Sequence, residues 1–69
     1  MKYRDFRAII EAQGFALERE RATHKQFVGV VGGQKRLVTL DYARPGDDIS
    51  DRNLASMIRQ SGLPKHLFR

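Results

Sequence analysis

The sequence predicts an α+β fold in which two helices cover one face of a three-stranded antiparallel sheet, in the order α-β-β-β-α. Three observations support this prediction. Both ends of the chain carry apolar residues at helical spacing. The middle of the chain is rich in β-branched and aromatic residues. The links between the middle segments are short, and short links join antiparallel strands because parallel strands need long crossovers.

The first helix is expected from about Tyr3 to Gln13. Phe6 and Ile10 lie four positions apart and therefore share one helical face. Gly14 supplies the left-handed residue that ends a helix, and Phe15 can then fold back onto Ile10.

Three segments are expected to form the sheet. Phe15 to Glu20 alternates apolar and polar residues, which predicts a half-buried strand. A turn at Arg21-Ala22-Thr23 leads to a second strand from about His24 to Val31. Gly32-Gly33 indicates a hairpin, because glycine accepts the positive φ of such turns. The third strand runs roughly from Arg36 to Asp41.

The segment from Tyr42 to Ile49 is a predicted connection. Ser50 is a good N-cap for a second helix that runs to about Gln60. This helix is expected to bury Leu54, Met57, Ile58 and Ser61. Gly62 ends it, and Pro64 prevents its continuation.

Length and composition predict one small globular domain over residues 1–69. The chain is 41% hydrophobic and 30% charged, and it has no cysteine. We therefore expect no disulfide and no thiolate metal site. No apolar run is long enough to span a membrane, and the N-terminus lacks the apolar stretch of a signal peptide. A complete cytoplasmic chain without membrane contact is expected.

The charge balance favours a polyanionic partner. Thirteen Lys and Arg residues against eight Asp and Glu residues give a net charge of +5, which suits nucleic acid binding or simply solubility. The only histidines are His24 and His66, and there is no Cys/His cluster or glycine-rich phosphate loop. The sequence therefore predicts no metal and no cofactor.

His24 stands among cationic and polar residues at the start of the second strand. Arg19, Arg21 and Thr23 precede it, and Lys25 follows it. RNA can be cleaved without metal if a base removes the ribose 2′-hydroxyl proton and cations stabilise charge on the phosphate. Histidine, with a reference pKa of about 6.5, suits that proton transfer. The alternative interpretation is a histidine that merely begins a strand.

Three stretches of the sequence form a pattern that covers nearly the whole chain. They are Met1–Phe6, the run Phe15-x-Leu17-x-Arg19-x-x-x-Thr23-His24-x-Gln26-Phe27, and Leu54–Leu63. Together they resemble the HicA (YcfA-like) toxin family. The resemblance implies a double-stranded-RNA-binding-domain-like fold, metal-independent cleavage of mRNA, and inhibition by a HicB-like antitoxin. It also implies that His24 is catalytic, because His24 occupies the family's Gly-Ser/Thr-His motif.

The pattern departs from the family at two positions. Ala22 stands where the family usually has glycine, and Lys25 stands where many members have a second histidine. The identity of the acid that protonates the leaving 5′-oxygen is therefore left open. Either His24 shuttles the proton alone, or Lys25 or an arginine assists electrostatically.

The remaining candidates each have two interpretations. Lys35 and Arg36 at the hairpin tip can hold an RNA backbone or solvate a turn. Phe27 can stack on a base, or it can pack in the core or against an antitoxin, and the strand parity that it shares with Val31 favours packing. Asp41, Asp47 and Asp48 would repel phosphate, so the loop after the third strand is expected to be a poor RNA contact, and it can instead contact an antitoxin.

The sequence thus predicts an mRNA-cleaving toxin in which single-stranded RNA contacts a cationic face. The expected RNA-binding residues around catalytic His24 are Arg19, Arg21, Thr23, Lys25, Lys35 and Arg36. A non-catalytic RNA-binding module on the same fold is the first alternative. A protein-interaction domain whose positive face meets an acidic antitoxin is the second.

Overall fold

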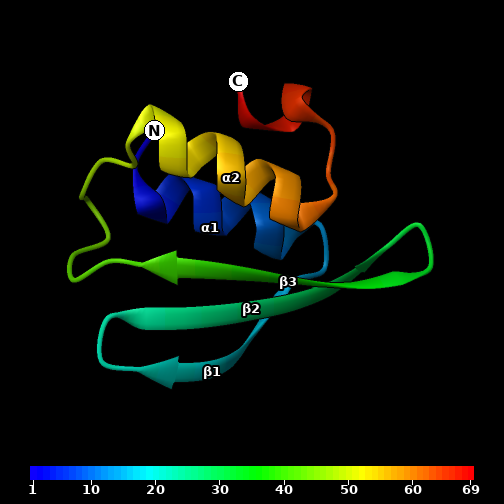
Figure 1. Ribbon diagram of the computed structural model, residues 1–69, viewed down its shortest axis with the longest axis horizontal. Coiled ribbons are helices and arrows are strands. Elements are labelled where there is room, and N and C mark those ends of the chain that lie inside the picture. The colour runs from blue at the N-terminus through cyan, green and yellow to red at the C-terminus, as the bar shows by residue number, and fades with distance from the viewer.

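The computed structural model describes residues 1–69 and places both helices on the same side of a three-stranded sheet (Figure 1). The elements are α1 (Tyr3–Ala12), β1 (Ala16–Arg21), β2 (His24–Val31), β3 (Gln34–Asp41), α2 (Asp51–Ser61) and the 3-10 helix η1 (Lys65–Phe68). The predicted α-β-β-β-α fold is confirmed, and β3 begins two residues earlier than expected. No sequence pattern predicted η1.

The sheet is an antiparallel meander with the strand order β1-β2-β3. β2 and β3 pair without interruption from Val31↔Gln34 at the hairpin to His24↔Asp41 at the other end. The pairing of β1 with β2 is irregular between Leu17 and Arg19, which indicates a β-bulge. Residues directly opposite each other point to the same face of a sheet, so these registers decide which side chains meet the helices.

One hydrophobic core fills the space between the helices and the sheet. Its buried residues are Tyr3, Phe6, Ile10, Phe15, Phe27, Val38, Leu40, Tyr42, Ile49, Met57 and Phe68. Phe27 is fully buried, which confirms the prediction that it packs in the core and excludes stacking on a base. Phe68 of η1 stacks on Phe6 with ring centroids 4.8 Å apart, so the C-terminal turn closes the core.

β1 differs from the predicted half-buried strand. All six of its residues are exposed, and even Leu17 is 37% exposed. The apolar residues that face the helices belong to β2 and β3, including Phe27, Val38 and Leu40. β1 is therefore an edge strand beyond the helices, and only Phe15, just before it, reaches the core.

Both ends of α2 form as predicted. The Ser50 Oγ accepts a hydrogen bond from the Asn53 backbone N–H at 3.2 Å, and Gly62 ends the helix with a φ of 70°. A Cβ at Gly62 would lie 2.7 Å from Nε of Arg36. The Arg36 guanidinium thus packs against the C-terminal end of α2, where the helix dipole favours a cation.

Arg7 joins α1 to the sheet. Its guanidinium lies 5.0 Å from the centroid of the Phe27 ring, and its Nη1 donates a hydrogen bond of 3.1 Å to the Tyr42 hydroxyl. The hydrogen bond to Tyr42, with the nearby Glu11 carboxylate, raises the pKa of Arg7. Arg7 therefore remains charged and serves the packing of the fold.

Gly29→Ala is expected to lower the free energy of unfolding by about 1–3 kcal/mol through overpacking. A Cβ at Gly29 would lie 2.6 Å from Cδ1 of the buried Phe15 ring. The measurement is urea denaturation. Gly46→Ala is the control, because its new Cβ would meet only the end of the Arg4 side chain, at 3.7 Å. Equal losses of stability in the two variants would contradict the tight contact at Gly29.

Candidate functional site

A cationic hollow lies on the open face of the sheet, beside the turn between β1 and β2. It encloses about 200 Å³ and is lined by Arg19, Arg21, His24 and Gln26. Arg21 lies directly opposite His24, and Arg19 lies directly opposite Gln26, so the four side chains share one face. The structure thus brings together three residues that the sequence singled out, and it adds Gln26.

Asp41 approaches His24 from the other neighbouring strand. The two residues are direct partners in the pairing of β2 with β3, and Nδ1 of His24 lies 3.8 Å from Oδ2 of Asp41. The side chains are 62% and 56% exposed, so both remain open to a ligand. A carboxylate beside Nδ1 favours the tautomer with the proton on Nδ1, orients the ring and leaves Nε2 for proton transfer. From the sequence, Asp41 is expected only to repel phosphate.

The turn before His24 consists of Ala22 and Thr23. Ala22 has a φ of 53°, and it is the only non-glycine residue with a positive φ. A positive φ at the first of two central residues is typical of a type II′ turn, which favours glycine there. The Thr23 carbonyl accepts a hydrogen bond of 3.1 Å from the Tyr42 backbone N–H. This bond ties the turn to the residue that follows β3.

Lys25 lies on the face opposite His24, because successive strand residues alternate between the two faces. Its Nζ donates a hydrogen bond of 3.0 Å to the Tyr42 carbonyl and lies 3.7 Å from Oε2 of Glu20. The same ammonium lies 4.0 Å from the centroid of the Tyr42 ring, and the side chain is only 12% exposed. The expected contact of Lys25 with RNA beside His24 does not fit this placement.

Two further predicted RNA-binding residues also lie away from the cationic hollow. Lys35 pairs with Val30, six positions before Asp41 on β3. At about 3.4 Å per residue, Lys35 is roughly 20 Å along the strand from His24. Arg36 faces the helices, and its Nε is buried without a hydrogen-bond partner. Neither residue can bind the same phosphate as His24.

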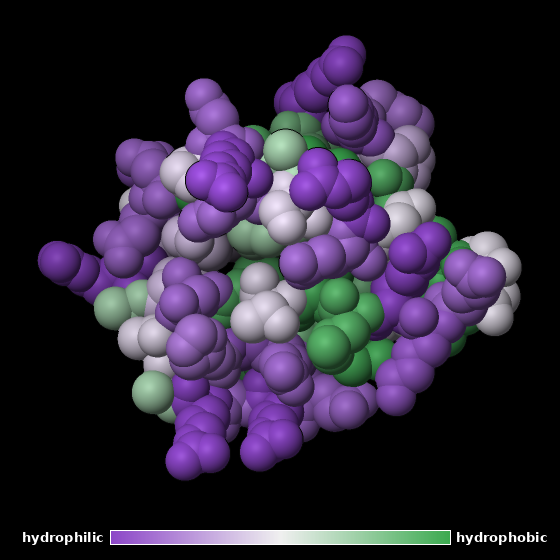
Figure 2. Space-filling model, viewed as in Figure 1, coloured by the Kyte–Doolittle hydropathy of each residue, from purple (hydrophilic) through white to green (hydrophobic).

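The open face beyond the cationic hollow is apolar. Val30 is 67% exposed and Leu37 is 48% exposed, and Leu37 lies opposite Val28. Figure 2 likewise shows green hydrophobic atoms exposed in the middle of the molecule among purple hydrophilic side chains. Charged and apolar surfaces therefore adjoin on this small domain.

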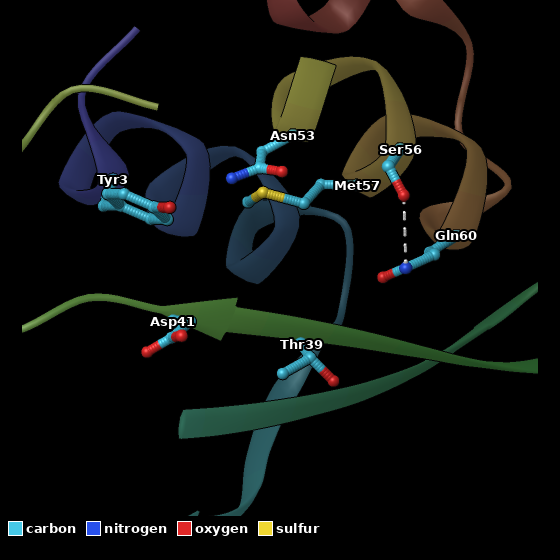
Figure 3. Close-up of a pocket in the computed structure, with 7 residues that line it drawn as sticks. All are labelled: Tyr3, Thr39, Asp41, Asn53, Ser56, Met57 and Gln60. Carbon is cyan, nitrogen blue, oxygen red and sulfur yellow. Dashed lines mark hydrogen bonds between the residues drawn. The ribbon is translucent and has the colours of Figure 1, made fainter. Parts of the chain in front are cut away.

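A second hollow, here called the β3-edge hollow, lies between α2 and β3 (Figure 3). It encloses about 240 Å³. Its lining residues are Tyr3, Thr39, Asp41, Asn53, Ser56, Met57 and Gln60. These residues come from three elements far apart in the sequence, so no local motif indicated the hollow.

No group of three or more His, Cys, Asp and Glu side chains is placed to hold a metal ion. None of the helices has both the length and the apolar character needed to cross a membrane. Comparison of the chain with protein-family models, with curated proteins and with solved structures gives no match.

Ala22→Gly is expected to raise the free energy of unfolding by up to about 1.6 kcal/mol. The left-handed conformation costs a non-glycine residue about 1–2 kcal/mol, and the freedom of glycine in the unfolded chain offsets about 0.4–1 kcal/mol of the gain. Ala22→Pro is expected to lower the stability, because proline fixes φ near −65°. Thermal unfolding of both variants tests this expectation. A glycine variant less stable than the wild type would argue against strain at Ala22.

Proposed function

We propose that the chain is a metal-independent endoribonuclease, a toxin of HicA type that cleaves mRNA in the cytoplasm. The observation that carries the proposal is the placement of His24 between the Asp41 carboxylate and two arginines in an open cationic hollow. The sequence resemblance points to the same histidine. A general base and phosphate-binding cations on one exposed face are the groups that metal-free RNA cleavage requires.

In the proposed reaction, His24 removes the proton from a ribose 2′-hydroxyl. The 2′-oxygen then forms a bond to the adjacent phosphorus, and the bond from phosphorus to the 5′-oxygen breaks. The imidazolium returns its proton to the leaving 5′-oxygen. The products are a 2′,3′-cyclic phosphate and a free 5′-hydroxyl, so neither an electron acceptor nor a second substrate is needed. Because Lys25 faces the helices, His24 is the better candidate for this acid.

Arg19 and Arg21 supply the positive charge in this proposal. Guanidinium groups bind phosphate oxygens through paired hydrogen bonds and stabilise the extra negative charge of the transition state. Asp41 acts as a positioning residue, since it faces Nδ1 and leaves Nε2 free for proton transfer. Lys25 and Arg36 contribute to folding, and Lys35 lies too far away to assist at the same phosphate.

A HicB-like antitoxin is the proposed protein partner. The exposed apolar residues Val30 and Leu37 lie on the same face as the cationic hollow. A partner with an acidic and partly apolar surface would cover both regions and exclude RNA from His24. This arrangement is typical of interfaces that join an apolar centre to a charged rim.

A non-catalytic RNA-binding module is the second candidate function. It is favoured by the separation of 3.8 Å between His24 and Asp41, which is longer than a hydrogen bond, and by the lack of a second histidine in the hollow. Such a module would bind RNA with strong salt dependence and leave every strand intact.

The purified protein is expected to cleave a mixed-sequence RNA in excess EDTA. Loss of the general base in His24→Ala is expected to lower the rate at least about 100-fold. His66→Ala is the matched control, because His66 is exposed on η1 and outside the cationic hollow, so it should cleave at the wild-type rate. Circular dichroism checks that both variants are folded. Undiminished cleavage by His24→Ala would overturn the assignment, and RNA binding without any cleavage would support the second candidate.

Asp41→Asn is expected to lower kcat about 1.4- to fivefold with little change in KM. An ion pair between half-exposed groups contributes about 0.2–1 kcal/mol, and this range converts to that loss of rate. Asp51→Asn removes the same charge at the exposed start of α2 and should leave kcat unchanged. Steady-state kinetics on one RNA of uracil alone compare the variants, and an Asp41→Asn variant with wild-type kcat would remove Asp41 from the mechanism.

A further inference from the structure

The β3-edge hollow lies next to the site around His24, and the two share one residue. Asp41 belongs to both, because it faces His24 across the strand pair and also lines the β3-edge hollow. Neighbouring strands lie about 4.8 Å apart, so the β3-edge hollow is about one strand away from His24. A nucleotide whose phosphate sits at His24 can therefore place its base over the edge of β3.

The lining of the β3-edge hollow differs in chemistry from the cationic hollow. It holds no Lys or Arg, and its only charged group is the Asp41 carboxylate. This lining rejects a phosphate. The amides of Asn53 and Gln60 each carry a hydrogen-bond donor and an acceptor, which is the combination that reads the edge of a base. The cationic hollow thus suits the phosphate of a nucleotide, and the β3-edge hollow suits its base.

The lining of the β3-edge hollow comes from opposite sides. Asn53, Met57 and Gln60 of α2 lie above β3, with Tyr3 at one end and Thr39 and Asp41 below (Figure 3). Met57 is buried and gives the hollow an apolar wall. Gln60 Nε2 is held only by a long hydrogen bond of 3.5 Å to Ser56 Oγ, so it can exchange this partner for a ligand.

Tyr3 adds a hydrogen-bond donor to the β3-edge hollow. Burial raises the pKa of Tyr3, and the carboxylates of Asp41 and Asp47 raise it further. The phenol therefore keeps its proton, and its hydroxyl points toward Asn53 in Figure 3.

We propose that the β3-edge hollow binds the base next to the phosphate that is cleaved at His24, and that it gives the enzyme a preference for guanine over uracil at that position. This inference rests on the proposed ribonuclease function. Guanine presents two adjacent N–H donors on its Watson–Crick edge, which fit the two oxygens of Asp41. Its carbonyl oxygen and ring nitrogen accept hydrogen bonds from amides such as those of Asn53 and Gln60. Uracil offers a single N–H donor and cannot match this set.

A binding experiment tests the proposal without any cleavage. The protein carries His24→Ala and ¹³C-methyl methionine, and single-stranded tetranucleotides of guanine–uracil or of uracil alone are added. The chain has two methionines, so Met57 reports on the β3-edge hollow and Met1 serves as the internal reference. The Met57 methyl resonance is expected to shift more with the guanine-containing RNA than with the uracil RNA. An unmoved Met57 resonance at saturating RNA would overturn the proposal.

A cleavage experiment tests base preference in the active protein. The wild type is expected to cleave at guanine faster than at uracil, and Gln60→Ala is expected to reduce this ratio about two- to tenfold, the loss typical of one hydrogen bond. Gln34→Ala removes the same side chain at the exposed start of β3 and should keep the wild-type ratio. A ratio that Gln60→Ala leaves unchanged would overturn the proposal. Absence of all cleavage would instead reject the ribonuclease function, and the Met57 experiment would still decide whether a base binds.

Discussion

The turn at Gly32-Gly33 fixes the register on which both the core and the candidate site depend. Both glycines have a positive φ, 58° and 79°, as a type I′ turn requires. From this turn the pairing of β2 with β3 runs unbroken to His24 and Asp41. A slip of one residue would turn every side chain of one strand to the other face. Phe27 would then leave the core, and His24 would leave the open face.

Tyr42 connects this register to the rest of the fold. Its ring stacks on Tyr3 with centroids 4.9 Å apart, and its hydroxyl accepts the hydrogen bond from Arg7. Its backbone binds the Thr23 carbonyl and the Lys25 ammonium. The turn that presents His24 is thus fastened to the first helix through one buried aromatic residue. Two of the chain's cations serve this junction and are not free for RNA.

The predictions that succeeded depend on local signals. The N-cap at Ser50, the left-handed stop at Gly62 and the hairpin glycines act within a few residues, so the sequence identifies them. Lys25 and Arg36 were misplaced because their burial depends on Tyr42 and on the end of α2, which only the folded chain brings near them. The pairing of Asp41 with His24 could be predicted from the sequence, because a two-residue turn at Gly32-Gly33 places them opposite each other. The β3-edge hollow could not be predicted in this way, since it forms only when α1 and α2 pack beside β3.

The exposed edge strand β1 has a consequence for how the protein behaves at high concentration. A bare strand edge offers unpaired amides and carbonyls to any other chain, and uninterrupted pairing between copies leads to aggregation. Four consecutive charged residues and a bulge occupy this edge, in the run Glu18, Arg19, Glu20 and Arg21. A second copy aligned there would have to accommodate these charges and the bulge against its own. The arginines that serve the cationic hollow therefore also help to keep a small sheet from growing into a larger one.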